Sequence, residues 1–265
     1  MIERKLEQAL EVTPWQHIAY EPDDELKEVE TKLAADPENA RLWMDKGLVL
    51  AKNSLYREAE ECYAHAISLA PFDGILYRHR AHRFLSQWRF EDARADFVIA
   101  SRLIPENWDV WYHLGLSNFL LGDYKKAAYQ RCLELSTKED ELIAVCDWYY
   151  MTELRLGDKG AAKKLLDNIH EDFDPGDNAD YFRRLLMYKG VVKPEDVLPK
   201  DIAGMKPLDV VTLGFGLSNY YWYNGEKEKS NALIDRILEV GDSSDCYVAF
   251  GYLAAKVDKT NRAKA

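Results

Sequence analysis

The sequence lacks any long apolar run and has few of the residues that break helices. Its 265 residues include only 9 prolines and 14 glycines, whereas tyrosine and tryptophan number 16 and 7. No stretch approaches the roughly 18 uncharged apolar residues that a membrane span needs. Few breakers and many large aromatic side chains are typical of helices packed on helices rather than of a turn-rich β fold. We therefore expect an all-α protein that has no membrane partner.

The features of an exported or nucleic-acid-binding protein are also missing. Residues 1–7 are charged where a signal peptide needs apolar residues, so we expect a cytoplasmic protein. The formal net charge of −11 opposes binding to nucleic acid over a broad surface, because such binding depends on clustered Lys and Arg. The cysteines contain no C-x-x-C pair and indicate neither a zinc site nor a disulfide framework. We expect four buried thiols: Cys62, Cys132, Cys146 and Cys246.

No catalytic arrangement stands out either. Residues 214–219 hold two of the three glycines of a dinucleotide fingerprint, but they lie inside a helical pattern. Residues 157–164 lack P-loop spacing and fit a turn followed by a lysine-bearing helix. Acidic clusters at 23–25 and 139–141 stand where negative charge favours the start of a helix. Three histidines stand alone on predicted helices: His65, His113 and His170. We therefore predict a non-enzymatic protein with no cofactor and no metal site.

A repeat of 34 residues is the strongest signal in the sequence. At this offset an aromatic residue, a small residue, a second aromatic residue and an alanine align in three units. The aligned positions are Trp43, Tyr77 and Trp111; Gly47, Ala81 and Gly115; Tyr56, Phe90 and Tyr124; and Ala59, Ala93 and Ala127. Apolar residues recur at helical spacing on both sides of a turn in each unit, which predicts two antiparallel helices per unit. Small residues at Gly47 and Ala59 allow these two helices to approach closely.

This pattern resembles the tetratricopeptide repeat family at residues 40–73, 74–107 and 108–141. Lys46 and Arg80 depart from the family pattern, since a leucine usually precedes the small residue. The resemblance implies an all-α, right-handed superhelical solenoid of antiparallel helix pairs. Outside the clear repeats we predict an N-terminal segment (1–24), one repeat domain (25–258), weaker units (143–173, 178–208 and 211–241), a terminal helix (245–257) and a polar tail (259–265).

The resemblance also implies where a partner would bind. The first helices of such a solenoid line its concave face, and the family presents a stripe of side chains there. Transferred to this sequence, the stripe includes an apolar set of Met44, Leu48, Tyr112, Leu116, Phe119 and Met151, together with Arg41, Arg78 and His82. Exposed apolar patches usually mark interaction sites. We therefore expect a scaffold that binds a protein or peptide in this groove.

Charge in the second unit points to an acidic group on that partner. Arg78 and His82 share the stripe at i and i+4 and could hold a carboxylate or phosphate, with the histidine contributing more below about pH 6.5. Alternatively, Arg80, Arg83 and Arg94 pair with acidic side chains of neighbouring units. The family's clamp for chaperone tails is not expected, because the matching positions hold other residues: Met44, Leu48, His79, Asp109 and His113.

Two other readings of the sequence stay open. The groove could be filled internally by an N-terminal segment around Trp15, Ile18 and Tyr20. In that case the protein would be a structural or self-assembling repeat protein, whose terminal helix mediates oligomerisation through Tyr247, Phe250 and Leu253. An enzyme with a site near the irregular stretch 191–208 is a third reading. The sequence leaves the oligomeric state open.

Overall fold

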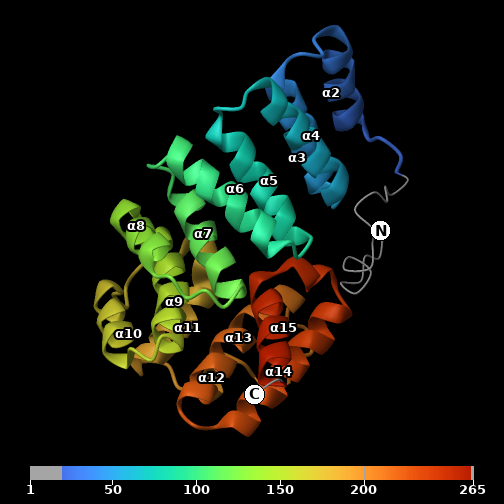
Figure 1. The fold of residues 1–265 in the computed structure, drawn as a ribbon. Coiled ribbons are helices and arrows are strands. Elements are labelled where there is room, and N and C mark those ends of the chain that lie inside the picture. The colour runs from blue at the N-terminus through green and yellow to red at the C-terminus, as the bar shows by residue number, and fades with distance from the viewer. Residues whose placement is uncertain (1–19, 200, 264–265) are drawn as a thin grey trace. The chain divides into compact units, whose positions relative to one another are not determined.

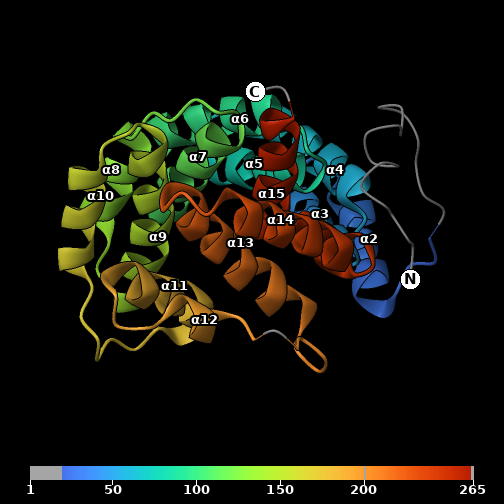
Figure 2. The same cartoon turned by 90° about the horizontal axis from the view of Figure 1, so that it is seen from below.

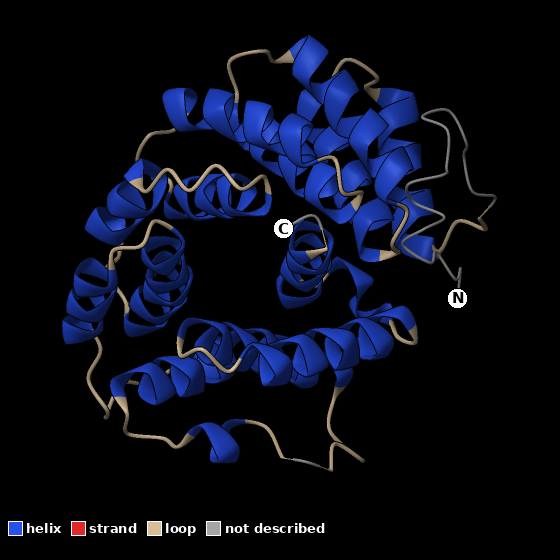
Figure 3. Cartoon of the chain, turned by 60° about the horizontal axis from the view of Figure 1, so that its bottom comes forward, coloured by secondary structure: helices blue, strands red, loops and turns tan. Residues whose placement is uncertain are grey.

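The computed structural model describes residues 20–199 and 201–263, and this part of the chain is helical without a strand (Figure 3). The all-α prediction is confirmed. Helix α2 (Asp24–Ala35) precedes the clear repeats, which begin with α3 (Ala40–Lys52), α4 (Tyr56–Leu69), α5 (Gly74–Ser86), α6 (Phe90–Leu103) and α7 (Trp108–Leu120). They are followed by α8 (Ala127–Leu135), α9 (Glu139–Arg155), α10 (Lys159–Leu165), α11 (Ala179–Lys189), α12 (Pro194–Val197), α13 (Pro207–Tyr223), α14 (Lys227–Asp242) and α15 (Phe250–Arg262).

The chain divides into two compact units, unit 1 (Met1–Ser117) and unit 2 (Asn118–Ala265), where the sequence predicts a single domain over 25–258. In a repeat array each helix pair packs mainly on its neighbours. In unit 1, α3 packs on α4, α4 on α5 and α5 on α6 (Figure 1). In unit 2, α9 packs on α10 and α11, while α13, α14 and α15 pack on one another (Figure 2).

A hydrogen bond with the same spacing recurs in every clear repeat. The aromatic side chain near the start of each first helix donates to the carbonyl of the proline six residues earlier. Trp43 Nε1 donates to Pro37 at 2.8 Å, the Tyr77 hydroxyl to Pro71 at 3.1 Å and Trp111 Nε1 to Pro105 at 2.7 Å. The three aromatic residues therefore fix the turn between successive helix pairs as well as filling space.

The turn inside each helix pair also keeps the repeat. Ser54, Trp88 and Gly122 follow one another at intervals of 34 residues, and all three have a positive φ, of 60°, 62° and 72°. Glycine adopts this left-handed conformation at little cost, whereas serine and tryptophan are strained in it. Two successive non-glycine residues at this position show that helix packing, rather than local preference, sets the turn.

Close packing within the first repeat follows the prediction for Gly47. A β-carbon added at Gly47 would lie 2.6 Å from Cε1 of Tyr63, so the ring occupies the space that a larger residue would need. Ala59, Ala81 and Ala93 are completely buried at equivalent close approaches. Small residues at these positions therefore let the paired helices touch.

Several predicted boundaries are shifted. The terminal helix α15 runs from Phe250 to Arg262 instead of 245–257, so residues 259–262 continue the helix where a polar tail was predicted. Lys259 and Arg262 are held by acidic partners, Asp235 and Asp258, which stabilises this last turn. The short helix predicted after Pro194 is present as α12.

Of the cysteines, Cys62, Cys132 and Cys146 are buried, but Cys246 is only half-buried. None of the described helices is both long and apolar enough to span a membrane.

Candidate functional site

The apolar stripe predicted to be exposed is mostly buried. Only Leu48 is exposed, at 39%, while the other five apolar members are at most 5% exposed: Met44, Tyr112, Leu116, Phe119 and Met151. The expectation of an open apolar patch is therefore wrong for these five residues. Repeat spacing assigns residues to a face of a helix, but it does not say which later segments cover that face.

In unit 2 the cover comes from helices further along the chain. The ring of Phe119 packs edge-on against Trp148 with centroids 5.2 Å apart, and Trp148 stacks on Phe215 of α13 at 5.8 Å. Met151 Sδ lies 3.2 Å from Nη2 of Arg184 on α11. These stripe residues are thus core of unit 2. The N-terminal cover proposed from Trp15 and Ile18 lies outside the described residues, and Tyr20 packs against the core of α2, α3 and α4.

The polar members of the stripe bind an acidic group within the chain itself. Arg78 Nε donates to Asp109 Oδ2 at 2.7 Å, and Nε2 of His82 lies 3.3 Å from the same oxygen. Asp109 stands on α7, one repeat later, where the register brings it beside the stripe of α5. The carboxylate that Arg78 and His82 were expected to hold is therefore Asp109 of the same chain. Arg41 is exposed and pairs with Asp45, one turn along α3, at 3.2 Å.

Burial changes the chemistry of these groups. Desolvation, followed by the proximity of His113, lowers the pKa of His82 to about 3, so the expected gain of charge below pH 6.5 does not occur. Desolvation and the nearby Arg78 lower the pKa of His79 to about 4. Burial of Asp109 would raise its pKa, but His113, His82 and Arg78 outweigh burial and hold the pKa well below its usual range.

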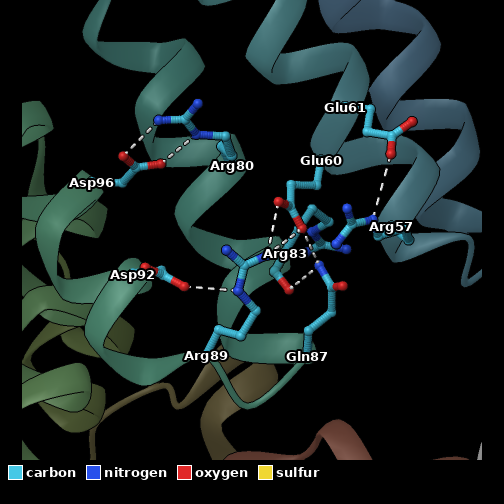
Figure 4. A network of polar contacts seen from close by, with 9 residues as sticks. All are labelled: Arg57, Glu60, Glu61, Arg80, Arg83, Gln87, Arg89, Asp92 and Asp96. Atoms are coloured by element: carbon cyan, nitrogen blue, oxygen red, sulfur yellow. Dashed lines mark hydrogen bonds and ion pairs between the residues drawn. The ribbon is translucent and has the colours of Figure 1, made fainter. Parts of the chain in front are cut away.

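Arg80 and Arg89 of the second repeat pair with acidic side chains, but the partner of Arg80 lies in its own repeat rather than in a neighbouring unit (Figure 4). Arg80 forms two hydrogen bonds with Asp96, at 2.7 and 2.9 Å, and Arg89 joins Glu60 at 2.8 Å and Asp92 at 2.7 Å. Arg83 instead lies over the ring of Tyr56 at 5.1 Å. The basic character of this sequence segment is thus largely neutralised inside unit 1.

A cavity of about 350 Å³ opens in unit 2 between the first helices α9, α11 and α13 and the second helix α10. Tyrosines and lysines dominate its lining, which consists of Tyr150, Leu154, Lys159, Lys163, Leu166, Asp167, Tyr188, Lys189, Tyr220, Tyr223 and Asn224. Three lysines face a single aspartate, so the cavity carries positive charge. None of the nine stripe residues named from the sequence lines this cavity.

The aromatic wall of this cavity is rigid. Tyr150 on α9 and Tyr188 on α11 stack with centroids 4.3 Å apart and an interplanar angle of 14°. The Tyr188 hydroxyl donates to the carbonyl of Gly216 on α13 at 3.1 Å. Burial raises the pKa of Tyr150 to about 12, so its hydroxyl stays protonated and can donate a hydrogen bond. Three helices are thereby joined around a preformed wall.

The three lysines that line the cavity differ in the contacts that they make within the chain. Lys189 Nζ donates to the carbonyls of Leu166 and Ile169, at 3.2 and 2.6 Å, and so ties α11 to the end of the α10 segment. Lys159 and Lys163 are exposed, one turn apart on α10, and form no ion pair or hydrogen bond within the described chain. Asp158 caps α10 by accepting from the amide of Ala161 at 2.8 Å and thereby fixes the helix that presents them.

Sequence reasoning assigned these residues only to a lysine-bearing helix after a turn. The spacing of Lys159 and Lys163 at i and i+4 was the available signal, because it places both on one helix face. Their opposition to the tyrosines depends on α11 and α13, whose repeats are the most altered. The sequence could therefore indicate the lysine pair but not the aromatic wall.

Comparison with known proteins agrees with the repeat pattern. Tetratricopeptide repeat family profiles match residues 40–73 and 79–139. The heat-shock protein cognate (HSC) co-chaperone sgt12 of Aspergillus fumigatus is 31% identical over 103 residues, covering 38% of this chain and 30% of that protein. Tetratricopeptide repeat protein 33 of Mus musculus is 30% identical over 100 residues, covering 37% of this chain and 38% of that protein. The chain thus spans less than two fifths of the length of either relative.

Solved structures extend the likeness in fold. A tetratricopeptide repeat protein from Parabacteroides merdae superposes with a TM-score of 0.56 and 15% identity, covering 86% of this chain and 90% of that one. Its coverage includes repeats that the family profiles do not match. The repeat register and the family profiles therefore identify residues 40–73 and 79–139 as tetratricopeptide repeats, and the solved structure shows that the fold of the chain is similar to that of a tetratricopeptide repeat protein.

Proposed function

We propose that the chain is a non-enzymatic scaffold that binds a peptide segment of a partner protein through the cavity of unit 2. The cavity receives an acidic side chain or a C-terminal carboxylate of that segment, together with the apolar atoms next to it. The observation that carries the proposal is the opposition of two unpaired lysines, Lys159 and Lys163, to a wall of tyrosines.

The chemistry of the cavity fits recognition. Lysine ammonium groups and tyrosine hydroxyls donate hydrogen bonds to carboxylates, and the tyrosine rings offer apolar contact at low entropic cost. A preformed wall also avoids the ordering cost that weakens binding by flexible surfaces.

The relatives supply a weaker argument in the same direction. One is named a co-chaperone, a class of protein that acts together with another protein. The expected partner is accordingly a protein or peptide, with no role for nucleic acid or membrane and with a cytoplasmic location.

The self-assembly alternative gains no support from its proposed contact residues. Leu253 of the terminal helix is fully buried, and Tyr247 lies in a short 3-10 turn before the helix begins. Leu253 therefore serves the packing of unit 2, whereas Tyr247 and Phe250 are partly buried.

Charge reversal on the cavity rim tests the proposal. Peptides are first selected on the full chain from a displayed random library, and we expect the enriched sequences to combine acidic and apolar residues. For the best peptide, Lys159→Glu/Lys163→Glu should weaken binding roughly tenfold or more, since both attractive charges become repulsive.

The matched control is Lys164→Glu/Lys193→Glu, which changes the net charge equally at exposed lysines outside the cavity lining. Its affinity should stay within about twofold of the wild type. Equal losses in the two double variants would show that only net charge matters. An unchanged affinity in Lys159→Glu/Lys163→Glu would reject the cavity as the site.

A further inference from the structure

Metal-ligating side chains gather in unit 1, far along the sequence from the residues of the cavity. His82 on α5, with Asp109 and His113 on α7, each offer one ligand atom, and these atoms lie within 4.8 Å of one another. Nε2 of His82 is 3.3 Å from Oδ2 of Asp109. Ligand atoms around a tetrahedral zinc ion are about 3.3 Å apart, so this pair is already at the required spacing.

Helix geometry explains why the three residues meet. Asp109 and His113 are separated by four residues on α7 and therefore project from the same face. His82 comes from the first helix of the preceding repeat. The rings of His82 and His113 approach with centroids 4.0 Å apart, and both contact the ring of Phe97 on α6. Each ligand is thus supported by the repeat packing.

Neighbouring groups orient the ligands as in known metal sites. Nδ1 of His113 lies 2.9 Å from the backbone carbonyl of Asp109, and this contact fixes the orientation of the ring. Arg78 holds Oδ2 of Asp109 at 2.7 Å, and Oδ1 of the same carboxylate lies 3.3 Å from Nδ1 of His113. Such outer contacts fix ligand orientation, although the Arg78 cation also opposes the binding of another cation.

The site is sheltered but accessible to a small ion. The side chains of His82, Asp109 and His113 are 17%, 28% and 9% exposed. Divalent metal ions bind carboxylates in the ionised form and imidazoles in the neutral form.

We propose that His82, Asp109 and His113 bind a divalent transition-metal ion such as zinc, with Arg78 limiting the affinity. Two imidazoles and one carboxylate suit zinc better than calcium or magnesium, which prefer oxygen ligands. Three protein ligands leave the fourth tetrahedral position to water. The bound ion would link α5 to α7 and stiffen unit 1.

Titration of the full chain tests the proposal. After treatment with EDTA and desalting, calorimetry with zinc chloride should show one ion per chain. Cobalt(II) chloride should give the visible absorption bands of a tetrahedral site. His113→Ala and Asp109→Asn should each lower zinc affinity at least tenfold, with folding checked by circular dichroism.

Two further variants keep the test decisive if Asp109→Asn fails to fold. His82→Gln should also lower the affinity at least tenfold. Arg78→Gln should raise it severalfold, because a cation beside the carboxylate is removed. The control His170→Ala deletes an exposed histidine outside the cluster and should bind zinc like the wild type. Absence of zinc binding, or equal binding by the wild type and His113→Ala, would overturn the proposal.

Discussion

The two units use the same pair of residues in different surroundings. In unit 1, Arg78 and Asp109 from neighbouring first helices pair at 2.7 Å with side chains 27% and 28% exposed. In unit 2, Arg184 on α11 and Asp147 on α9 pair at 2.8 Å with no exposure at all. The pair in unit 1 is partly exposed, whereas the pair in unit 2 is enclosed by the core. Exposure, rather than residue type, separates the two roles.

Breaking the buried pair should have the largest effect. Arg184→Met leaves the Asp147 carboxylate buried without its partner and should lower the free energy of unfolding by about 3–5 kcal/mol. Arg78→Met at the exposed pair should cost about 1 kcal/mol or less, because water replaces the lost partner. Urea denaturation of the full chain measures both changes.

A double variant sharpens this comparison. Asp147→Leu/Arg184→Met removes both charges and should recover a large part of the stability that Arg184→Met loses. If Arg184→Met and Arg78→Met destabilised the chain equally, the contrast between the two pairs would be wrong.

Disturbing the close packing of the regular repeats should cause the next largest loss of stability. Gly47→Ala places a methyl group 2.6 Å from Tyr63 and should cost about 1–3 kcal/mol of stability. Gly160 on α10 of unit 2 is the control, since the nearest atom to an added β-carbon is Oδ1 of Asp158 at 3.5 Å. Gly160→Ala should be neutral or stabilise by up to about 1 kcal/mol through helix propensity. Thermal unfolding measures the stability of both variants. A Gly47→Ala variant as stable as the wild type would contradict the account.

Acid should lower the stability of unit 1 through its histidines His79 and His82. We expect this loss of stability to be smaller than the losses predicted above. The folded pKa values of His79 and His82, about 4 and 3, lie below the unfolded value of 6.5. The unfolded chain therefore binds protons first, so stability is complete above pH 6.5 and falls as the pH drops toward these folded values. His79 faces Arg41, Arg78, Arg83 and Asp109, while His82 faces Arg78, Asp109 and His113.

Variants isolate the contribution of these histidines. His79→Gln and His82→Gln should lose less stability than the wild type between pH 7 and 4.5, whereas exposed His65→Gln should follow the wild type. Melting temperatures across this pH range give the comparison. If the melting temperatures of all four proteins fell in parallel as the pH dropped, His79 and His82 would not contribute to the loss of stability in acid.

The sequence predicts the regular half of the fold well and the sites poorly, for physical reasons. Trp43, Tyr77 and Trp111 reveal the helix pairs because each makes the same local hydrogen bond six residues back. The burial of Phe119 depends on Phe215 of α13, a contact between distant repeats that no local spacing encodes. Local patterns therefore give helices, whereas exposure requires the tertiary structure.

The same reasoning applies to charge. Arg78 and His82 were correctly placed on one face, but their acidic partner Asp109 lies one repeat later and satisfies them internally. Lys159 and Lys163 have no such partner within the described chain and stay available in the cavity of unit 2. A basic segment in the sequence therefore does not tell whether its cations pair with acidic side chains of the chain or remain available to a ligand.

Mapping the peptide on the chain tests the central claim most directly. Backbone amide NMR of the labelled full chain, titrated with the selected acidic peptide, should show the largest shift changes around the cavity at Tyr150, Lys163, Tyr188 and Tyr220. Residues of the unit 1 stripe, such as Leu48 and Arg78, should change little. Shift changes concentrated at Leu48 and Arg78, with those around Tyr150 and Lys163 unmoved, would contradict the account.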